Sequence, residues 1–226
     1  MPLDAKADTV VSALRNTPEF THGLVRDLRV RWALEEIGRP YRTELFESMT
    51  PRPAAYRQWQ PFGQVPAFND GRVRLFETGA ILLHLGEEDE RLLPCEPQAR
   101  GDAVSWLFAA LNSVEPYIMQ LMWADVFKSG ESWSSEASPA MREMVRRRLD
   151  QLTEALRGEE WFAGDFSVAD IAMVTVLREL DYTGLFADYP KIAAYKARGE
   201  VRPAFRRALA DQIADLGEPI KLGEPA

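Results

Sequence analysis

Cysteine and histidine are scarce in this 226-residue sequence, which contains one cysteine and two histidines. The single cysteine, Cys95, excludes a disulfide within the chain and is typical of proteins in a reducing cytosol. Cys95 follows Pro94 and has no neighbouring group that would activate its thiol, which favours a structural role. Because His22, His84 and Cys95 lie far apart in the sequence, no spacing typical of metal ligands is present, and we expect no metal.

Long apolar runs and a basic excess are also missing. No segment approaches the ~18 consecutive apolar residues of a membrane-spanning helix, and no apolar stretch follows Lys6 as it does in a secretory signal. The net charge is −8, which argues against nucleic acid and anionic membranes as partners. A local basic cluster, Arg146 to Arg148, is flanked by acidic residues and indicates a solvated helix face. We therefore expect a cytoplasmic protein.

Hydrophobic residues make up 46% of the chain, enough for one large domain or two smaller ones. The first part alternates between strand patterns and helical periodicity. In order, it predicts a strand (9–14), a helix (24–37), a strand (41–46), a short helix (51–59), a hairpin (66–68 and 73–76) and a helix (77–86). A strand, a helix and a parallel strand require a right-handed crossover. The order predicts a mixed four-stranded sheet covered by helices.

The second part of the chain has helical periodicity throughout. Leu92 to Pro97 indicates a linker, and long helices are predicted for 98–128 and 139–156, with a mobile, serine-rich connection from Ser129 to Ser138. A further helix begins at Ser167 and is apolar almost all round, so it should be buried. Ser167 and Asp170 have the spacing of a capping box, with Phe166 placed to form a hydrophobic staple, so we interpret Asp170 as structural.

Two short motifs in the first part carry the most functional information. Val65-Pro66 leads into a predicted strand, where a proline cannot donate to the sheet. If the bond is cis, Val65 turns its own N–H and C=O outward, where they can pair with an extended ligand. Glu77-Thr78 follows the hairpin and opens a helix, placing an acid and a hydroxyl at a helix N-terminus. This combination can hold a small zwitterionic peptide.

With these motifs, the chain resembles the cytosolic glutathione transferase superfamily over nearly its whole length. The residues that carry the resemblance are Leu28 to Glu36, Gln64-Val65-Pro66, Glu77-Thr78 and Ser167 to Asp170. The resemblance is greatest to bacterial members. It implies a thioredoxin-like N-terminal domain (1–93), a linker (94–100), an all-helical C-terminal domain (101–226) and a cytosolic homodimer.

The resemblance also implies a role for each residue of the site. Val65 would pair through its backbone with the cysteinyl unit of glutathione, and Pro66 would be the cis proline. Glu77 would meet the ligand's ammonium, while Thr78 and the helix N-terminus would take the γ-glutamyl carboxylate. The remaining contacts would be a hydrogen bond from Gln64 to the peptide and an ion pair between Arg52 and the glycyl carboxylate.

The chain departs from the family where a hydroxyl or thiol usually activates the glutathione sulfur. Only a few per cent of a free cysteine thiol is thiolate at neutral pH, and the family's activating group stands at the start of the first helix. The matching positions here are Leu24, Val25 and Arg26, and none of them supplies a hydroxyl. Possible substitutes are Thr17 or Thr21 from the preceding loop, His22 as a donor or base, Arg26 by charge, and Tyr117 from the helical domain.

The helical domain would hold the second substrate, a small apolar electrophile. An aromatic and methionine stripe runs along its first long helix, and we expect part of it to line a cleft. Its members are Trp106, Phe108, Asn112, Glu115, Tyr117, Met119, Met122, Trp123 and Phe127. The sequence therefore predicts an enzyme that adds the glutathione thiolate to this electrophile. A glutathione-dependent isomerase or dehalogenase, or a non-catalytic glutathione-binding module, stays as an alternative.

Overall fold

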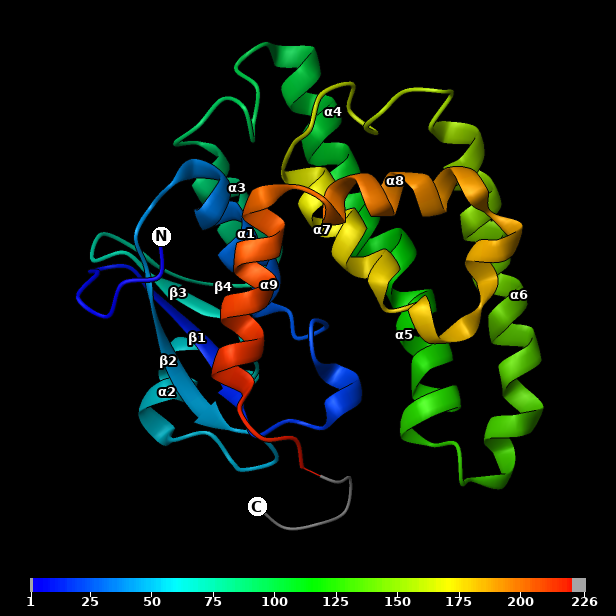
Figure 1. The fold of residues 1–226 in the computed structure, drawn as a ribbon, viewed down its shortest axis with the longest axis horizontal. Coiled ribbons are helices and arrows are strands. Elements are labelled where there is room, and N and C mark those ends of the chain that lie inside the picture. The colour runs from blue at the N-terminus through cyan, green and yellow to red at the C-terminus, as the bar shows by residue number, and fades with distance from the viewer. Residues whose placement is uncertain (1, 221–226) are drawn as a thin grey trace. The chain divides into compact units, whose positions relative to one another are not determined.

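The computed structural model describes residues 2–220 (Figure 1). The chain divides into two compact units. One unit contains the residues up to Asp89 together with the segment from Val201 onward, and the other is Glu90–Glu200. The domain boundaries predicted from the sequence (1–93, 94–100 and 101–226) stay a prediction. Residue 1 and residues 221–226, which belong to the first and last of these ranges, lie outside the described residues.

The first unit is built on the mixed four-stranded sheet that the sequence predicted. Its strands are β1 (Val10–Arg15), β2 (Arg42–Glu47), β3 (Ala67–Asn69) and β4 (Arg74–Phe76), in the order β2-β1-β3-β4. β1 is parallel to β2 and antiparallel to β3, and β3 is antiparallel to β4. This arrangement confirms the thioredoxin-like topology.

Helices cover both faces of this sheet: α1 (Asp27–Ile37), α2 (Ala54–Trp59) and α3 (Thr78–Gly86). α1 begins three residues after the predicted start at Leu24, because a 3₁₀ turn at Glu19–Thr21 and a further turn come first. Side chains alternate between the faces of a strand. Ser12 of β1 contacts Tyr56 of α2, whereas α1 contacts β1 and α3, so α1 and α2 lie on opposite faces.

The last helix, α9 (Pro203–Leu216), packs beside α1 within the first unit (Figure 1). The rings of Trp32 and Phe205 meet with centroids 4.9 Å apart. Arg31 is fully buried, and its guanidinium pairs with Asp27 at 2.6 Å and with Asp215 of α9 at 2.8 Å. Burial acts to lower the pKa of Arg31, but these carboxylates outweigh it and raise the pKa. The pairing lets a charge stay in the core.

The second unit is helical, as predicted. It contains α4 (Pro97–Phe108), α5 (Glu115–Met122), α6 (Ser132–Ala155), α7 (Val168–Arg178) and α8 (Pro190–Glu200), with short 3₁₀ turns at Asp181–Thr183 and Leu185–Asp188. π-Helical segments at Ala109–Val114 and Trp123–Phe127 interrupt the long helix predicted for 98–128. The first ends at Val114, two residues before Pro116, which has no N–H to donate to the helix ladder.

The serine-rich segment from Ser129 to Ser138 was predicted to be a mobile connection, and this was wrong from Ser132 onward. α6 begins at Ser132 and includes the remaining serines. The Ser134 hydroxyl lies 3.0 Å from the Ala124 carbonyl and 2.6 Å from that of Lys128. These contacts fix the first turn of α6 to the end of the preceding helix, which composition alone does not reveal.

The capping box at α7 is confirmed. The Ser167 hydroxyl accepts from the Ala169 N–H at 3.3 Å, and the Asp170 carboxylate accepts from the Ser167 N–H at 2.9 Å. Asp170 also accepts from the Tyr195 hydroxyl at 2.7 Å. Burial raises the pKa of Asp170 to about 6. All these partners belong to helix termini and core, which supports the structural interpretation of Asp170. The Phe166 ring contacts Trp161 at 5.0 Å.

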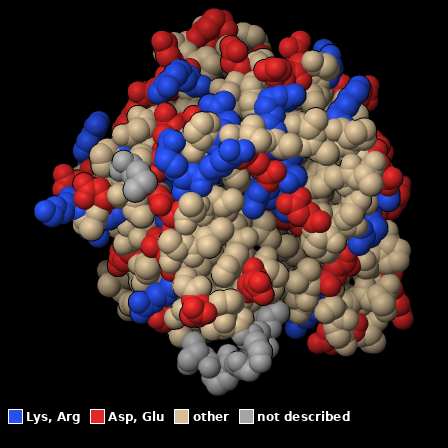
Figure 2. All heavy atoms as spheres, in the orientation of Figure 1, with Lys and Arg blue, Asp and Glu red and all other residues tan. Residues whose placement is uncertain are grey.

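Two further predictions concern surfaces and membranes. Figure 2 shows one face of the molecule, on which basic side chains gather across the upper middle with acidic side chains beside and between them. Within residues 2–220, no helix combines the length and apolar character needed to cross a membrane.

Candidate functional site

The strand register brings most of the predicted site residues to one edge of the sheet. Ala67 pairs with Phe76, so the residues before β3 and those after β4 lie side by side. Val11 pairs with Phe68, and the C-terminal end of β1 therefore reaches the same edge. β2 is parallel to β1 and ends there too. The loop after β1, the loop before β3 and the start of α3 thus meet at this edge, the carboxyl end of the parallel strands.

Val65 lies at the centre of this edge. The Val65–Pro66 peptide bond is cis, as the family resemblance implied. Among residues 2–220, neither the N–H nor the C=O of Val65 has a hydrogen-bond partner. Unpaired backbone groups beside a strand are a template for an extended ligand.

A chain of hydrogen bonds that the sequence analysis missed holds the loop before β3. The Tyr56 hydroxyl donates to the Gln64 carbonyl at 2.6 Å, so its one hydrogen is used. Ser12 must therefore donate to Tyr56 across 2.7 Å, and the Ser12 oxygen accepts from the Ala67 N–H at 2.6 Å. The Gln64 N–H donates to the buried Gln60 side chain. Ser12 was a detectable signal, because a buried hydroxyl in an apolar strand requires a partner.

The start of α3 presents the second motif. Glu77 is exposed and has a φ of 70°, the left-handed region that a non-glycine residue rarely adopts. Such strain persists at binding sites. Thr78 is buried, and its hydroxyl accepts from Arg29 of α1 at 3.3 Å. The N–H groups that begin α3 have no partner within the helix and favour an anion.

Arg52 and Gln64 also lie beside the cis-proline loop. The Arg52 guanidinium donates to the Glu47 and Thr50 carbonyls at 2.8 and 2.9 Å. Its Cγ is 3.5 Å from the position that a Cβ on Gly63 would take. Burial lowers the pKa of Arg52. The Gln64 side chain is exposed next to Val65.

The loop after β1 carries the candidates for thiol activation. The Thr21 hydroxyl donates to the Pro18 carbonyl at 2.7 Å, so its hydrogen is already used. His22 is half-buried, and its Nε2 is shielded from solvent without a hydrogen-bond partner among the described residues. The Thr17 hydroxyl is also buried without a partner in that part of the chain. Arg26 directly precedes α1.

Two other predicted residues have different surroundings. In the second unit, the Tyr117 hydroxyl accepts from Arg148 at 2.9 Å, and the guanidinium carbon lies 4.4 Å from its ring centre. In the first unit, His84 lies on α3. It contacts the Phe68 ring, and its Nε2 also lies 3.0 Å from the Asp70 carboxylate.

Asp70, His84 and Glu88 are the described residues that could hold a metal ion, because their ligand atoms lie within 4.8 Å of one another. Arg39 donates to both carboxylates of this group. The Arg39 guanidinium pairs with both carboxylates, so the cluster forms an ion-pair network.

Comparison with known proteins identifies the same two-part organisation. Residues 20–87 match the family described as the glutathione S-transferase N-terminal domain, and residues 115–203 match the corresponding C-terminal domain. The glutathione S-transferase GstA of Escherichia coli O157:H7 is 31% identical over 161 residues, which cover 66% of this chain and 74% of GstA.

Two solved structures show how close the folds are. A glutathione transferase family member from Pseudomonas fluorescens, with two glutathione bound, has a TM-score of 0.77 and 25% identity, covering 89% of this chain and 92% of that one. A glutathione transferase from Burkholderia graminis, with two glutathione molecules bound per protein subunit, has a TM-score of 0.76 and 26% identity, covering 89% and 87%. From the fold, the two matched domains and these relatives, the chain belongs to the glutathione S-transferase family.

Proposed function

We propose that this chain is a glutathione transferase that adds the glutathione thiolate to a small apolar electrophile. The observation that carries this proposal is that the N–H and C=O of Val65, beside the N-terminus of α3, have no hydrogen-bond partner in the part of the chain that the structure describes. The relatives named as glutathione transferases and those with glutathione bound support it.

The groups along the sheet edge match the groups of glutathione. The backbone of Val65 pairs with the cysteinyl unit, and the Gln64 side chain bonds to the peptide. Glu77 takes the ammonium, and the helix start at Thr78 takes the γ-glutamyl carboxylate. Arg52 takes the glycyl carboxylate with those of its N–H donors that are not directed at backbone carbonyls.

His22 is the group that we assign to the sulfur, because its shielded Nε2 has no hydrogen-bond partner among residues 2–220. A buried imidazole nitrogen without a partner is costly, and a bound thiol would satisfy it. The N–H form can donate to the thiolate, and the bare nitrogen can accept the thiol proton. Arg26 adds positive charge at the start of α1, and the helix dipole acts in the same direction. The hydrogen of the Thr21 hydroxyl is already donated to the Pro18 carbonyl, so we assign Thr21 no part in activating the thiol.

The electrophile site is proposed on the exposed part of the aromatic stripe. Phe108, Trp123 and Phe127 are exposed, and the rings of Trp123 and Phe127 lie 5.6 Å apart. Met122 and Glu115 are buried and serve the core instead. Trp123 and Phe127 lie in a π-helical segment, and such segments are frequent at functional sites.

Absorbance of the bound thiolate, titrated with pH, tests the activation directly. We expect the thiol pKa of bound glutathione to lie below that of free glutathione and to rise toward it in His22→Asn. Thr21→Val is the matched control from the same loop and should leave it unchanged. An unchanged thiol pKa in the wild type favours the non-catalytic binding module. Glutathione consumed without a conjugate favours a dehalogenase, and unconsumed glutathione with a changed substrate favours an isomerase.

We further propose a cytoplasmic homodimer. The single cysteine fits a reducing compartment. Phe62 is 69% exposed, and its ring lies 6.3 Å from that of Phe76, which is 37% exposed. Such a pair beside the site suits a contact with a second copy. Light scattering should give the mass of two chains, and Phe62→Ser should lower it toward one.

A further inference from the structure

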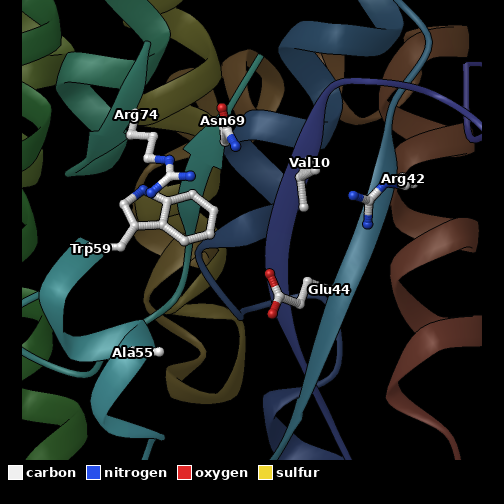
Figure 3. Close-up of a pocket in the computed structure, with 7 residues that line it drawn as sticks. All are labelled: Val10, Arg42, Glu44, Ala55, Trp59, Asn69 and Arg74. Carbon is white, nitrogen blue, oxygen red and sulfur yellow. The ribbon is translucent and has the colours of Figure 1, made fainter. Parts of the chain in front are cut away.

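The face of the sheet on which α2 lies carries a pocket of about 240 Å³. Its lining residues come from all four strands and from α2: Val10, Arg42, Glu44, Ala55, Trp59, Asn69 and Arg74 (Figure 3). Val10 and Arg42 begin their strands, and Asn69 ends β3. The pocket therefore lies at the opposite end of the strands from the glutathione site.

One cross-strand row forms the floor of this pocket. Arg42 pairs with Val10, Val10 with Asn69, and Asn69 with Arg74. Residues directly opposite one another project from the same face of a sheet. The row therefore places one guanidinium on each of the two outer strands, β2 and β4. At the usual spacing between strands, the Cα atoms of Arg42 and Arg74 are roughly 14 Å apart. In Figure 3 the Arg42 side chain extends toward Val10, and the Arg74 side chain extends toward the Trp59 ring.

Several polar groups around the pocket lack partners among residues 2–220. The side chains of Arg74 and Glu44 make no hydrogen bond or ion pair in that part of the chain. Arg42 uses its Nε, which donates to the Ala7 carbonyl at 3.2 Å, and leaves its other donors for a ligand.

Trp59 supplies the observation that points most directly to a ligand. Its Nε1 is shielded from solvent and has no hydrogen-bond partner among the described residues. A buried N–H without an acceptor destabilises the folded state. A ligand with an acceptor atom in the pocket would remove this cost. Asn69 has a spare donor as well, because its side-chain oxygen already accepts from the Gly71 N–H at 2.9 Å.

We propose that this pocket binds a small acidic amino acid, a ligand with two carboxylates and one ammonium group. The guanidinium groups of Arg42 and Arg74 each match a carboxylate. Glu44 matches the ammonium, while Trp59 and Asn69 donate to the carboxylate oxygens. The volume lies below the ~300–1,000 Å³ of pockets for drug-sized ligands, which suits an amino acid.

A titration with L-glutamate tests this site, with the indole N–H signals monitored by NMR at constant pH and ionic strength. The chain has six tryptophans, and the indole signal missing from Trp59→Phe identifies Trp59. We expect that signal to shift saturably in the wild type. Arg74→Gln should weaken the binding about tenfold or more, the cost of losing a charge-assisted hydrogen bond. Arg72→Gln, an exposed neighbour outside the pocket, should leave it unchanged.

Two analogues separate the charges of the ligand. Glutarate lacks the ammonium and should bind more weakly than L-glutamate, and Glu44→Gln should reduce that difference. L-Glutamine lacks one carboxylate and should also bind more weakly. A fixed Trp59 signal, an equal shift with sodium chloride, or an equal response of Arg74→Gln would overturn the proposal. So would loss of the response in Glu77→Ala, since that would assign the binding to the glutathione site.

Discussion

At the scale of single residues, Glu77 combines an exposed carboxylate with a backbone conformation suited to glycine. Left-handed conformations cost a non-glycine residue about 1–3 kcal/mol. The fold keeps this residue at the start of α3, beside the unpaired backbone of Val65. The strain is therefore explained if the carboxylate has a ligand to bind.

Substitutions at Glu77 should separate binding from stability. Glu77→Ala should weaken glutathione binding about tenfold or more, because a charge-assisted hydrogen bond is lost. Glu77→Gly should weaken it similarly but raise the free energy of unfolding by about 1 kcal/mol, since glycine relieves the strain. Calorimetry measures the affinity for glutathione, and urea unfolding measures the free energy of unfolding. Wild-type affinity in either variant would mean that the ammonium site lies elsewhere.

Asp70 should make the stability of the first unit depend on pH. Burial acts to raise the pKa of this carboxyl. Hydrogen bonds from the backbone N–H groups of Val73 and Arg72 and from the His84 side chain, together with the charge of Arg39, outweigh burial and hold the pKa below its usual value. The folded state therefore keeps Asp70 charged where the unfolded chain binds a proton. This stabilisation is present above about pH 4 and is lost as the pH falls toward the folded-state pKa.

Asp70→Asn should be less stable than the wild type at pH 7, and the difference should shrink as the pH falls below about 4. Urea unfolding at a series of pH values measures it. The Asn side chain keeps an oxygen for the turn, and it removes the charge and the oxygen that faces Arg39 and His84. If the difference in stability between the wild type and Asp70→Asn stayed constant from pH 7 to below about pH 4, the charge of Asp70 would not be the source of the pH dependence.

At the scale of elements, the loop before β3 depends on the bonds that join β1, α2 and Gln64. Tyr56→Phe removes the one hydroxyl that connects Ser12 to the Gln64 carbonyl. Leaving these groups unsatisfied should cost about 1–3 kcal/mol of stability and should weaken glutathione binding, because the loop presents Val65. Tyr182→Phe, at a tyrosine that is 44% exposed, is the control for both measurements. Equal effects of the two substitutions would refute the role of this chain of bonds.

Local patterns predicted the elements well, and contacts distant in sequence were not predictable. The hairpin predicted for 66–68 and 73–76 and the capping box at Ser167 each depend on a few neighbouring residues, whereas the cis Val65–Pro66 bond was implied by the family resemblance. Ser12 and Tyr56 are 44 residues apart, and Arg31 and Asp215 are 184 apart. No periodicity reports which buried polar groups will pair over such separations. The start of α6 at Ser132 was missed for the same reason, since its anchors are carbonyls of the preceding helix.

At the scale of the whole molecule, the first unit is completed by the end of the chain. α9 covers Trp32 and supplies Asp215 to the buried Arg31. Gln212 of α9 also donates to Asp27 at 2.8 Å and to the Val25 carbonyl at 2.9 Å, beside the start of α1. The sequence-based N-terminal domain lacks all of these partners.

A fragment of residues 1–93 should therefore fail to fold on its own. Without α9 it leaves Arg31 short of one carboxylate and exposes the apolar face of α1, and unpaired buried charges are strongly destabilising. Circular dichroism during urea unfolding should show no cooperative transition, in contrast to the full chain. A sharp transition in the fragment would show that α9 is dispensable.

The central claim is that glutathione lies extended along Val65 with its ammonium at Glu77. A crystal structure of the chain at saturating glutathione tests it most directly. We predict that the Val65 N–H and C=O pair with the cysteinyl unit and that the γ-glutamyl group sits at the start of α3. Glutathione bound at another place, or no glutathione at this edge of the sheet, would contradict the account.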